Sequence, residues 1–322
     1  MNDVRIFSAE TTAARLPFGA LVKALEEGFA TGCELPERHH HIVERPGEPD
    51  ATLLLMPAWS STGDPRQYLG VKIVTVYPGN VARGLPGLVS TYILYDAVTG
   101  QQIGIMDGNT ITGRRTVATS ALAARMLARP ESSRLLVLGA GRIGSLLPHA
   151  YHAVLPIDHV EIWSPDAEEA EALVTRLHAD GMTATLVDNL ETAVHEADIV
   201  SAATLATEPL IKGDWIKPGT HVDLIGAFTP SMRESDNETV RKASIFVDTM
   251  EALHEAGDLV QPLRAGIISK DAILGSLADL SRGTVDARTS DNQITLFKAV
   301  GSGLADLVAA RMVYAGVDPQ DF

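Results

Sequence analysis

Short apolar runs in the first third of the chain predict a β-rich segment. The last of these runs contains Thr99-Gly100 between two apolar halves, which is typical of a hairpin turn. An amphipathic pattern predicts one helix over residues 14–32, ending at Gly32. The strand-like runs are, in order, residues 5–10, 40–44, 51–59, 70–78 and 90–108.

From Thr112 onward the apolar positions recur at helical spacing, which predicts a helix over residues 112–129 that Pro130 stops. Short apolar runs and helical stretches then alternate, and this alternation predicts a parallel, doubly wound sheet. Residues 291–316 are predicted to form one long helix with an apolar face. The expected fold class is therefore α/β.

Lys72 lies inside the strand-like run "GVKIVTVYP". Strand side chains alternate between faces, so Lys72 shares a face with Val74 and Val76, and the opposite face is also largely apolar. A buried ammonium without a partner is costly. The pattern therefore predicts that an anion binds Lys72.

Two arginines, Arg114 and Arg115, fall in the predicted first turn of the helix over residues 112–129. The helix dipole disfavours cations there by ~0.3–1 kcal/mol each, so the pair indicates an anion site. Arg38 precedes a strand of the same region and is equally compatible with a surface role. Adjacent strand residues face opposite ways, so His39–His41 do not predict a metal site.

Composition narrows the class of protein. A length of 322 residues favours two domains, and a formal charge of −15 argues against nucleic acid or an anionic membrane as partner. No apolar run approaches the roughly 20 residues of a spanning helix. Cys33 is the single cysteine, which excludes an internal disulfide, and the first residues lack the order of a signal peptide. A cytoplasmic protein is expected.

The stretch "RLLVLGAGRIG" carries Gly139-x-Gly141-x-x-Gly144 directly after an apolar strand and before a predicted helix. Glycines at this spacing permit a tight turn and close approach of the backbone to a pyrophosphate, so the motif predicts a Rossmann dinucleotide-binding domain. Asp166, after the second strand, is suited to the ribose hydroxyls of NADH. No Arg or Lys that could bind a 2′-phosphate lies between Ser164 and Arg176, which favours NADH but leaves NADPH open.

The strand "DIVSAAT" ends at Ala203 and Thr204, where ligands bind in such sheets. Thr204 is a candidate for contact with the nicotinamide ribose, although an ordinary strand-end threonine fits equally well. The full set of cofactor-binding candidates is Gly139, Gly141, Arg142, Ile143, Gly144, Asp166, Thr116, Ala203, Thr204 and Gly301.

Several stretches together resemble the ornithine cyclodeaminase/mu-crystallin family over nearly the whole chain. They include "GVKIVTVYPGN", "LYDAVTGQQIGIMDG", "TGRRTVATSALAARML", "VLGAGRIG" and "DLIGAFTPSMRESD". The resemblance implies an α/β substrate-binding and dimerisation domain (residues 1–112, with 294–322 returning to it) beside a Rossmann domain (113–293). It also implies a homodimer in which Lys72, Arg38 and Arg115 hold the substrate carboxylate.

One position separates the activities of that family. Cyclodeaminases carry an aspartate directly after the G-[GA] pair, whereas Phe228 follows Gly226-Ala227 here. Phenylalanine exchanges no proton, so the chain resembles the cyclic ketimine reductases, which convert Δ1-pyrroline-2-carboxylate and Δ1-piperideine-2-carboxylate to L-proline and L-pipecolate with NADH or NADPH. Phe228 is expected beside the ring, and Lys72 is a candidate proton relay.

Three alternatives stay open on sequence alone. They are an alanine-dehydrogenase-like oxidoreductase, an ornithine or lysine cyclodeaminase, and a non-enzymatic, nucleotide-dependent ligand-binding protein of the mu-crystallin kind. Retention of the complete cationic set, Lys72, Arg38 and Arg115, favours catalysis over ligand binding alone.

Overall fold

The computed structural model describes residues 4–64 and 66–316 and divides into two compact units. Unit 1 comprises Met1–Arg115 with Ser302–Phe322, and unit 2 comprises Thr116–Gly301. No helix within the described ranges is both long and apolar enough to cross a membrane.

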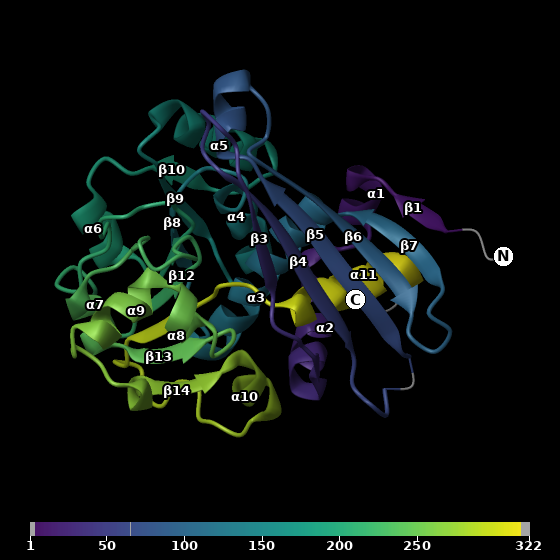
Figure 1. Cartoon of the computed structure of the whole chain (residues 1–322). Coiled ribbons are helices and arrows are strands. Elements are labelled where there is room, and N and C mark those ends of the chain that lie inside the picture. Colours follow the sequence, from purple (N-terminus) through teal and green to yellow (C-terminus); the bar gives the residue numbers. More distant parts are fainter. Residues whose placement is uncertain (1–3, 65, 317–322) are drawn as a thin grey trace. The chain divides into compact units, whose positions relative to one another are not determined.

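Unit 1 contains a mostly antiparallel seven-stranded sheet in the order β1-β7-β6-β5-β4-β2, with β3 pairing with β4. Helices α2 and α11 pack against each other, and α11 packs on β4 and β5 (Figure 1). The elements are β1 (Arg5–Phe7), α1 (Ala9–Ala14), α2 (Phe18–Thr31), β2 (Cys33–Glu34), β3 (His39–Val43), β4 (Ala51–Ser60), β5 (Tyr68–Val76), η1 (Pro78–Arg83), β6 (Leu88–Asp96), β7 (Gln102–Asp107) and α11 (Gly303–Ala315). Helix α3 (Gly108–Leu127) continues from unit 1 into unit 2.

Unit 2 contains an eight-stranded sheet whose pairings are all parallel, in the order β10-β9-β8-β11-β12-β15-β13-β14. From β8 the strand order runs outward to β10 and then resumes on the other side at β11, which is the topological switch of a Rossmann-type sheet. The predicted fold class is confirmed. The elements are β8 (Arg134–Leu138), η2 (Gly144–Leu146), α4 (Leu147–His152), β9 (His159–Trp163), α5 (Ala167–Ala179), β10 (Ala184–Leu186), α6 (Leu190–Glu196), β11 (Ile199–Ala202), β12 (His221–Leu224), α7 (Asn237–Lys242), β13 (Ser244–Val247), α8 (Ala252–Glu255), α9 (Gly257–Arg264), η3 (Lys270–Ala272), β14 (Ile273–Ser276), α10 (Leu277–Arg282) and β15 (Thr295–Lys298).

The prediction of one helix over residues 291–316 is wrong. Thr295–Lys298 form β15, a fully buried strand between β12 and β13, so this part of the segment belongs to unit 2. Gly301 has a φ of 86°, and the Ser302 hydroxyl accepts a hydrogen bond from the backbone N–H of Leu304, so α11 begins only after this break. A buried parallel strand reads as a continuous apolar run, and such a run does not distinguish a strand from a buried helix.

Two helix starts also differ from the predictions. The helix predicted over residues 14–32 begins at Phe18, because Pro17 occupies its N-cap position. Helix α3 begins at Gly108 instead of Thr112, and Asp107 Oδ1 accepts a hydrogen bond from the backbone N–H of Thr110 at 2.7 Å. The hairpin at Thr99-Gly100 is confirmed, since β6 and β7 pair across it.

Candidate functional site

A buried carboxylate joins the two cations that sequence patterns singled out in unit 1. Asp306, on α11, lies with Oδ2 2.6 Å from Lys72 Nζ and with Oδ1 2.7 Å from Arg115 Nε. The three side chains come from β5, α3 and α11, and Asp306 is fully buried. The partner anion predicted for Lys72 therefore exists within the chain itself, and sequence reasoning missed it.

The strands around Lys72 explain how its ammonium reaches α11. Lys72 pairs in register with Met56 on β4 and Tyr92 on β6, and all three side chains are buried on the face that α11 covers. A side chain at Gly70 would place its Cβ 2.0 Å from the Tyr92 hydroxyl oxygen. Glycine at this position therefore makes room for the Tyr92 ring beside the lysine.

The Lys72–Arg115–Asp306 cluster carries two positive charges and one negative charge. Burial opposes ionisation of Asp306, but Arg115 and Lys72 outweigh it and hold the pKa of this carboxyl below its usual range. Burial lowers the pKa of Lys72 to about 8, although Asp306 acts in the opposite direction. Lys72 is thus mostly charged at neutral pH, and its proton can be given up more readily than that of a surface lysine.

The other predicted cations have different positions. Arg38 directly precedes β3, and its charge lies near enough to Lys72 to help lower the pKa of that ammonium. Arg114 donates from Nε to the carbonyl oxygen of Leu16 at 2.7 Å and stacks over the Phe18 ring at 4.0 Å. The prediction that Arg114 and Arg115 lie in the first turn of this helix is wrong, because α3 begins at Gly108.

The glycine motif of unit 2 forms a tight loop after β8. Gly139 has a φ of 100°, and a Cβ there would lie 2.7 Å from the Ala203 carbonyl oxygen. A Cβ at Gly144 would lie 1.7 Å from the Gly139 carbonyl oxygen, whereas a Cβ at Gly141 would meet nothing within 4 Å. The backbone is too tightly packed for a side chain at Gly139 and Gly144, whereas the space beside Gly141 is empty. This space fits the approach of a pyrophosphate to the backbone.

The segment after the motif is short. A single 3-10 turn, η2, precedes α4, and Pro148 lies in the first turn of α4, where its missing N–H does no harm. Arg142 and Ile143 lie on the loop itself, and Thr116 is buried on α3. Their contact with a cofactor stays a prediction.

Several further candidates already make contacts within unit 2. Asp166 caps α5, since Oδ1 accepts from the backbone N–H of Glu169, and its role toward a ribose stays a prediction. The Thr204 hydroxyl donates to Glu234 Oε1 at 2.8 Å. The backbone N–H of Gly301 donates to Asp248 Oδ2 at 2.6 Å. Phe228 follows β12 by four residues and is 50% exposed.

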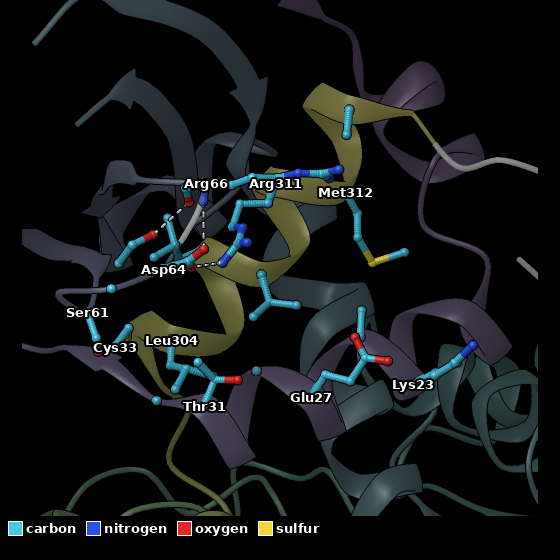
Figure 2. A pocket seen from close by; sticks show the side chains of 18 of the residues that line it. Lys23, Glu27, Thr31, Cys33, Ser61, Asp64, Arg66, Leu304, Arg311 and Met312 are labelled. Carbon is cyan, nitrogen blue, oxygen red and sulfur yellow. Dashed lines mark hydrogen bonds and ion pairs between the residues drawn. The ribbon is translucent and has the colours of Figure 1, made fainter. Parts of the chain in front are cut away.

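A cavity of about 760 Å³ lies in unit 1 and contains none of the predicted site residues. Figure 2 shows it between α2, the connection from β4 to β5, and α11, with the Asp64–Arg311 ion pair on its wall. Leu304, Leu307 and Val308 of α11 line it, whereas Asp306 does not. We therefore place the candidate site at the charged cluster and not at this cavity.

A family model matches residues 5–320 of the chain: the ornithine cyclodeaminase/mu-crystallin family. The chain belongs to this family. Among curated members, the Δ1-pyrroline-2-carboxylate reductase of Paracoccus denitrificans is 40% identical over 304 residues, covering 93% of this chain and 92% of the relative.

Two solved structures match this chain nearly end to end. The Thermococcus litoralis Δ1-pyrroline-2-carboxylate reductase, in complex with NADH and L-proline, superposes with a TM-score of 0.90 at 29% identity, covering 98% of this chain and 100% of that one. An archaeal alanine dehydrogenase dimer with bound NAD superposes with a TM-score of 0.89 at 28% identity, covering 97% and 95%.

Proposed function

We propose that this protein reduces cyclic imino acids with NADH or NADPH, converting Δ1-pyrroline-2-carboxylate to L-proline and Δ1-piperideine-2-carboxylate to L-pipecolate. The observation that carries the proposal is the Lys72–Arg115–Asp306 cluster, in which two buried cationic side chains converge on one carboxylate. A substrate carboxylate is the kind of ligand that two converging cationic side chains attract. The Paracoccus denitrificans and Thermococcus litoralis reductases support this choice of substrate class.

The proposed roles of the residues follow from their charges. Lys72, Arg115 and Arg38 bind and orient the substrate carboxylate, and Asp306 fixes the first two in place. Lys72 Nζ holds a proton whose pKa of about 8 suits transfer to the ring nitrogen near neutral pH. The cofactor, when bound at the glycine loop through Gly139, Gly141 and Gly144, supplies the hydride.

The first test measures imine reduction and ammonia release in parallel. Purified protein is given each cyclic imine with NADH or NADPH, and oxidation of the cofactor is followed by absorbance. Separate reactions contain L-ornithine, L-lysine, or pyruvate with ammonium. We expect oxidation with the imines and no ammonia from the diamines. Faster turnover of pyruvate than of either imine would instead support the alanine-dehydrogenase-like alternative, which the archaeal structure favours.

The variant Phe228→Asp tests the position that separates reductase from cyclodeaminase. We expect imine reduction to fall by roughly tenfold, because a carboxylate beside an apolar ring must be desolvated when substrate binds. Phe228 is half exposed, so folding should be unaffected. Phe228→Leu, which keeps an apolar side chain, is the matched control. Steady ammonia release from L-ornithine by the unaltered protein would contradict the proposed reaction.

We also propose a homodimer that buries the outer face of the unit 1 sheet. On this face an apolar row crosses five strands in register: Pro57, Val71, Ile93, Ile105 and Ile6. Ile6 is 78% exposed, and Trp59 on β4 and Val89 on β6, which alternate onto the same face as Pro57 and Ile93, are also exposed. A contiguous apolar surface of this kind marks an interface, and the archaeal relative is a dimer.

Light scattering tests this assembly. We expect a mass near twice 34.3 kDa for the unaltered protein and a shift toward the monomer for Ile93→Lys, because a lysine in the middle of the row must be desolvated in the dimer. Val98→Lys, at an exposed position in the β6–β7 turn, serves as the control. A monomeric mass for the unaltered protein at micromolar concentration would refute the dimer.

A further inference from the structure

A buried carboxylate in unit 2 connects the backbone beyond two neighbouring strands. Glu234 Oε1 accepts hydrogen bonds from the backbone N–H and the hydroxyl of Thr204, both at 2.8 Å. Glu234 Oε2 accepts from the backbone N–H of Gly226 at 2.7 Å and of Ala227 at 3.3 Å. Thr204 follows β11 and Gly226 follows β12, so one side chain sets the spacing of the two loops.

The two loops approach each other closely at Glu234. A Cβ at Gly226 would lie 1.8 Å from the Thr204 carbonyl oxygen and 2.5 Å from Glu234 Oε1. Only a glycine allows the backbone of the β12 loop to come this near to the β11 loop. Gly226 therefore permits the close approach of the two loops, and the Glu234 carboxylate holds them together by hydrogen bonds.

Glu234 is itself held by two further buried charges. Asp258 Oδ1 accepts from the backbone N–H groups of Glu234 and Ser235 at 2.8 and 3.0 Å. Lys298 Nζ lies 3.1 Å from Asp258 Oδ2 and 3.9 Å from Glu234 Oε2, and all three charged side chains are fully buried. A buried charge cluster contributes little net stability, because desolvation of the charges offsets their attraction. This cluster therefore points to a role in fixing geometry.

The place of this cluster in the sheet indicates what it fixes. Strands β8, β9 and β10 form the half of the sheet whose glycine loop and Asp166 are suited to the pyrophosphate and the adenosine ribose. Strands β11 and β12 lie across the topological switch, in the half that receives the other nucleoside. The loops joined by Glu234 leave the carboxyl ends of these two strands.

We propose that Glu234 is a positioning residue that fixes the two loops receiving the nicotinamide half of the cofactor. The proposal rests on the proposed use of NADH or NADPH. Removing one acceptor atom of Glu234 leaves buried N–H donors unpaired, so the loops separate and the nicotinamide loses its binding surface. The surfaces that bind the adenosine and the pyrophosphate are built on β8 and β9, and they stay intact.

The experiment compares NADH with ADP-ribose, which lacks the nicotinamide ring. Affinities of the purified full-length protein are measured by fluorescence titration for NADH and by calorimetry for ADP-ribose. We expect Glu234→Gln to weaken NADH binding by roughly tenfold or more and to change ADP-ribose binding less than twofold. Asp223→Asn is the matched control: Asp223 is also fully buried, but it lies within β12 and accepts from the hydroxyls of Ser120, Tyr151 and Ser201. Its effect on the two ligands should be equal.

A second pair of variants covers the case in which Glu234→Gln does not fold. Thr204→Val removes the hydroxyl donor to Glu234 while keeping the shape of the side chain, and Thr204→Ser keeps the donor. We expect the valine variant to lose affinity for NADH and not for ADP-ribose, and the serine variant, which keeps the donor to Glu234, to regain NADH affinity relative to the valine variant.

The possible outcomes separate the inference from the proposed function. Equal weakening of both ligands in folded Glu234→Gln or Thr204→Val, or no weakening of either, would overturn the positioning role. A split between NADH and ADP-ribose that also occurs in Asp223→Asn would overturn it too. Failure of the unaltered protein to bind either NADH or NADPH would refute the proposed function itself.

Discussion

Replacing Lys72 by methionine is expected to lower kcat/KM for the cyclic imines by about a thousandfold while the protein still folds. Lys72 is one of the two cations that contact Asp306, and its loss leaves the Arg115–Asp306 ion pair, with Nε and Oδ1 2.7 Å apart, in place. Arg115 and Asp306 stay paired, so the protein should still fold, whereas the substrate carboxylate loses the attraction of the Lys72 ammonium. Steady-state kinetics gives the loss, and a thermal unfolding scan verifies the fold. Near-normal kcat/KM would refute the carboxylate-binding role.

Asp306→Asn is the informative counterpart, because it changes the charge in the opposite direction. Without the carboxylate, Lys72 and Arg115 are two buried cations with no anion between them. Breaking a buried ion pair in this way costs about 3–5 kcal/mol, so this variant should lose stability strongly. A larger loss of stability in Lys72→Met than in Asp306→Asn would contradict the role of Asp306 as the anion that stabilises both cations.

The same cluster predicts a pH dependence with a definite sign. Because burial lowers the pKa of Lys72 to about 8, its charge is present at neutral pH and is lost as the pH rises through that value. KM for the imine should therefore rise above pH 8 in the unaltered protein. In Lys72→Met this rise should be absent, since no ammonium remains to titrate.

The sequence predicted the strand that carries Lys72 and the need for a buried anion, but not which anion. Lys72 and Asp306 lie far apart in the chain, and their pairing depends on α11 packing on β5, which no local pattern encodes. One signal was available. Asp306 is the one acidic residue of the mostly apolar "GLADLVAARMVYA", and a carboxylate in a helix that is buried almost all round needs a cation.

The error at Arg114 and Arg115 has a similar local cause. A strand does end at Asp107, as predicted, but the helix was expected to begin only at Thr112, whereas Asp107 also caps α3 by accepting from the backbone N–H of Thr110. An aspartate directly before a helical segment is an N-cap signal. With that start, both arginines fall well inside the helix, and only tertiary contacts decide that Arg114 packs on Phe18 while Arg115 reaches Asp306.

Lys298 shows how a wrong secondary-structure prediction hides a site. Interpreted as part of a helix, Lys298 is one charge on a long amphipathic pattern. As part of β15 it is a fully buried lysine in a parallel sheet, with the same need for an anion that Lys72 presents in unit 1. The Glu234–Asp258–Lys298 cluster was therefore invisible from sequence, whereas the glycine loop, whose signal is local, was predicted with its strand.

Replacing Gly141 by valine is expected to abolish measurable NADH binding while leaving the fold intact. A Cβ at Gly141 meets no atom within 4 Å, and the φ of this residue is not positive, so the side chain enters open space. That space is where the pyrophosphate approaches the backbone. The substitution therefore acts on the ligand and not on the loop, and Gly141→Ala should give a smaller loss of affinity.

Gly144→Ala is the control that separates these two effects. Its Cβ would lie 1.7 Å from the Gly139 carbonyl oxygen, so the loop itself must move and stability should fall together with NADH affinity. Fluorescence titration with NADH and thermal unfolding of all three variants distinguish the cases. If Gly141→Val bound NADH as tightly as the unaltered protein, the pyrophosphate would have to approach the loop elsewhere, and the glycines would serve only to close the turn after β8.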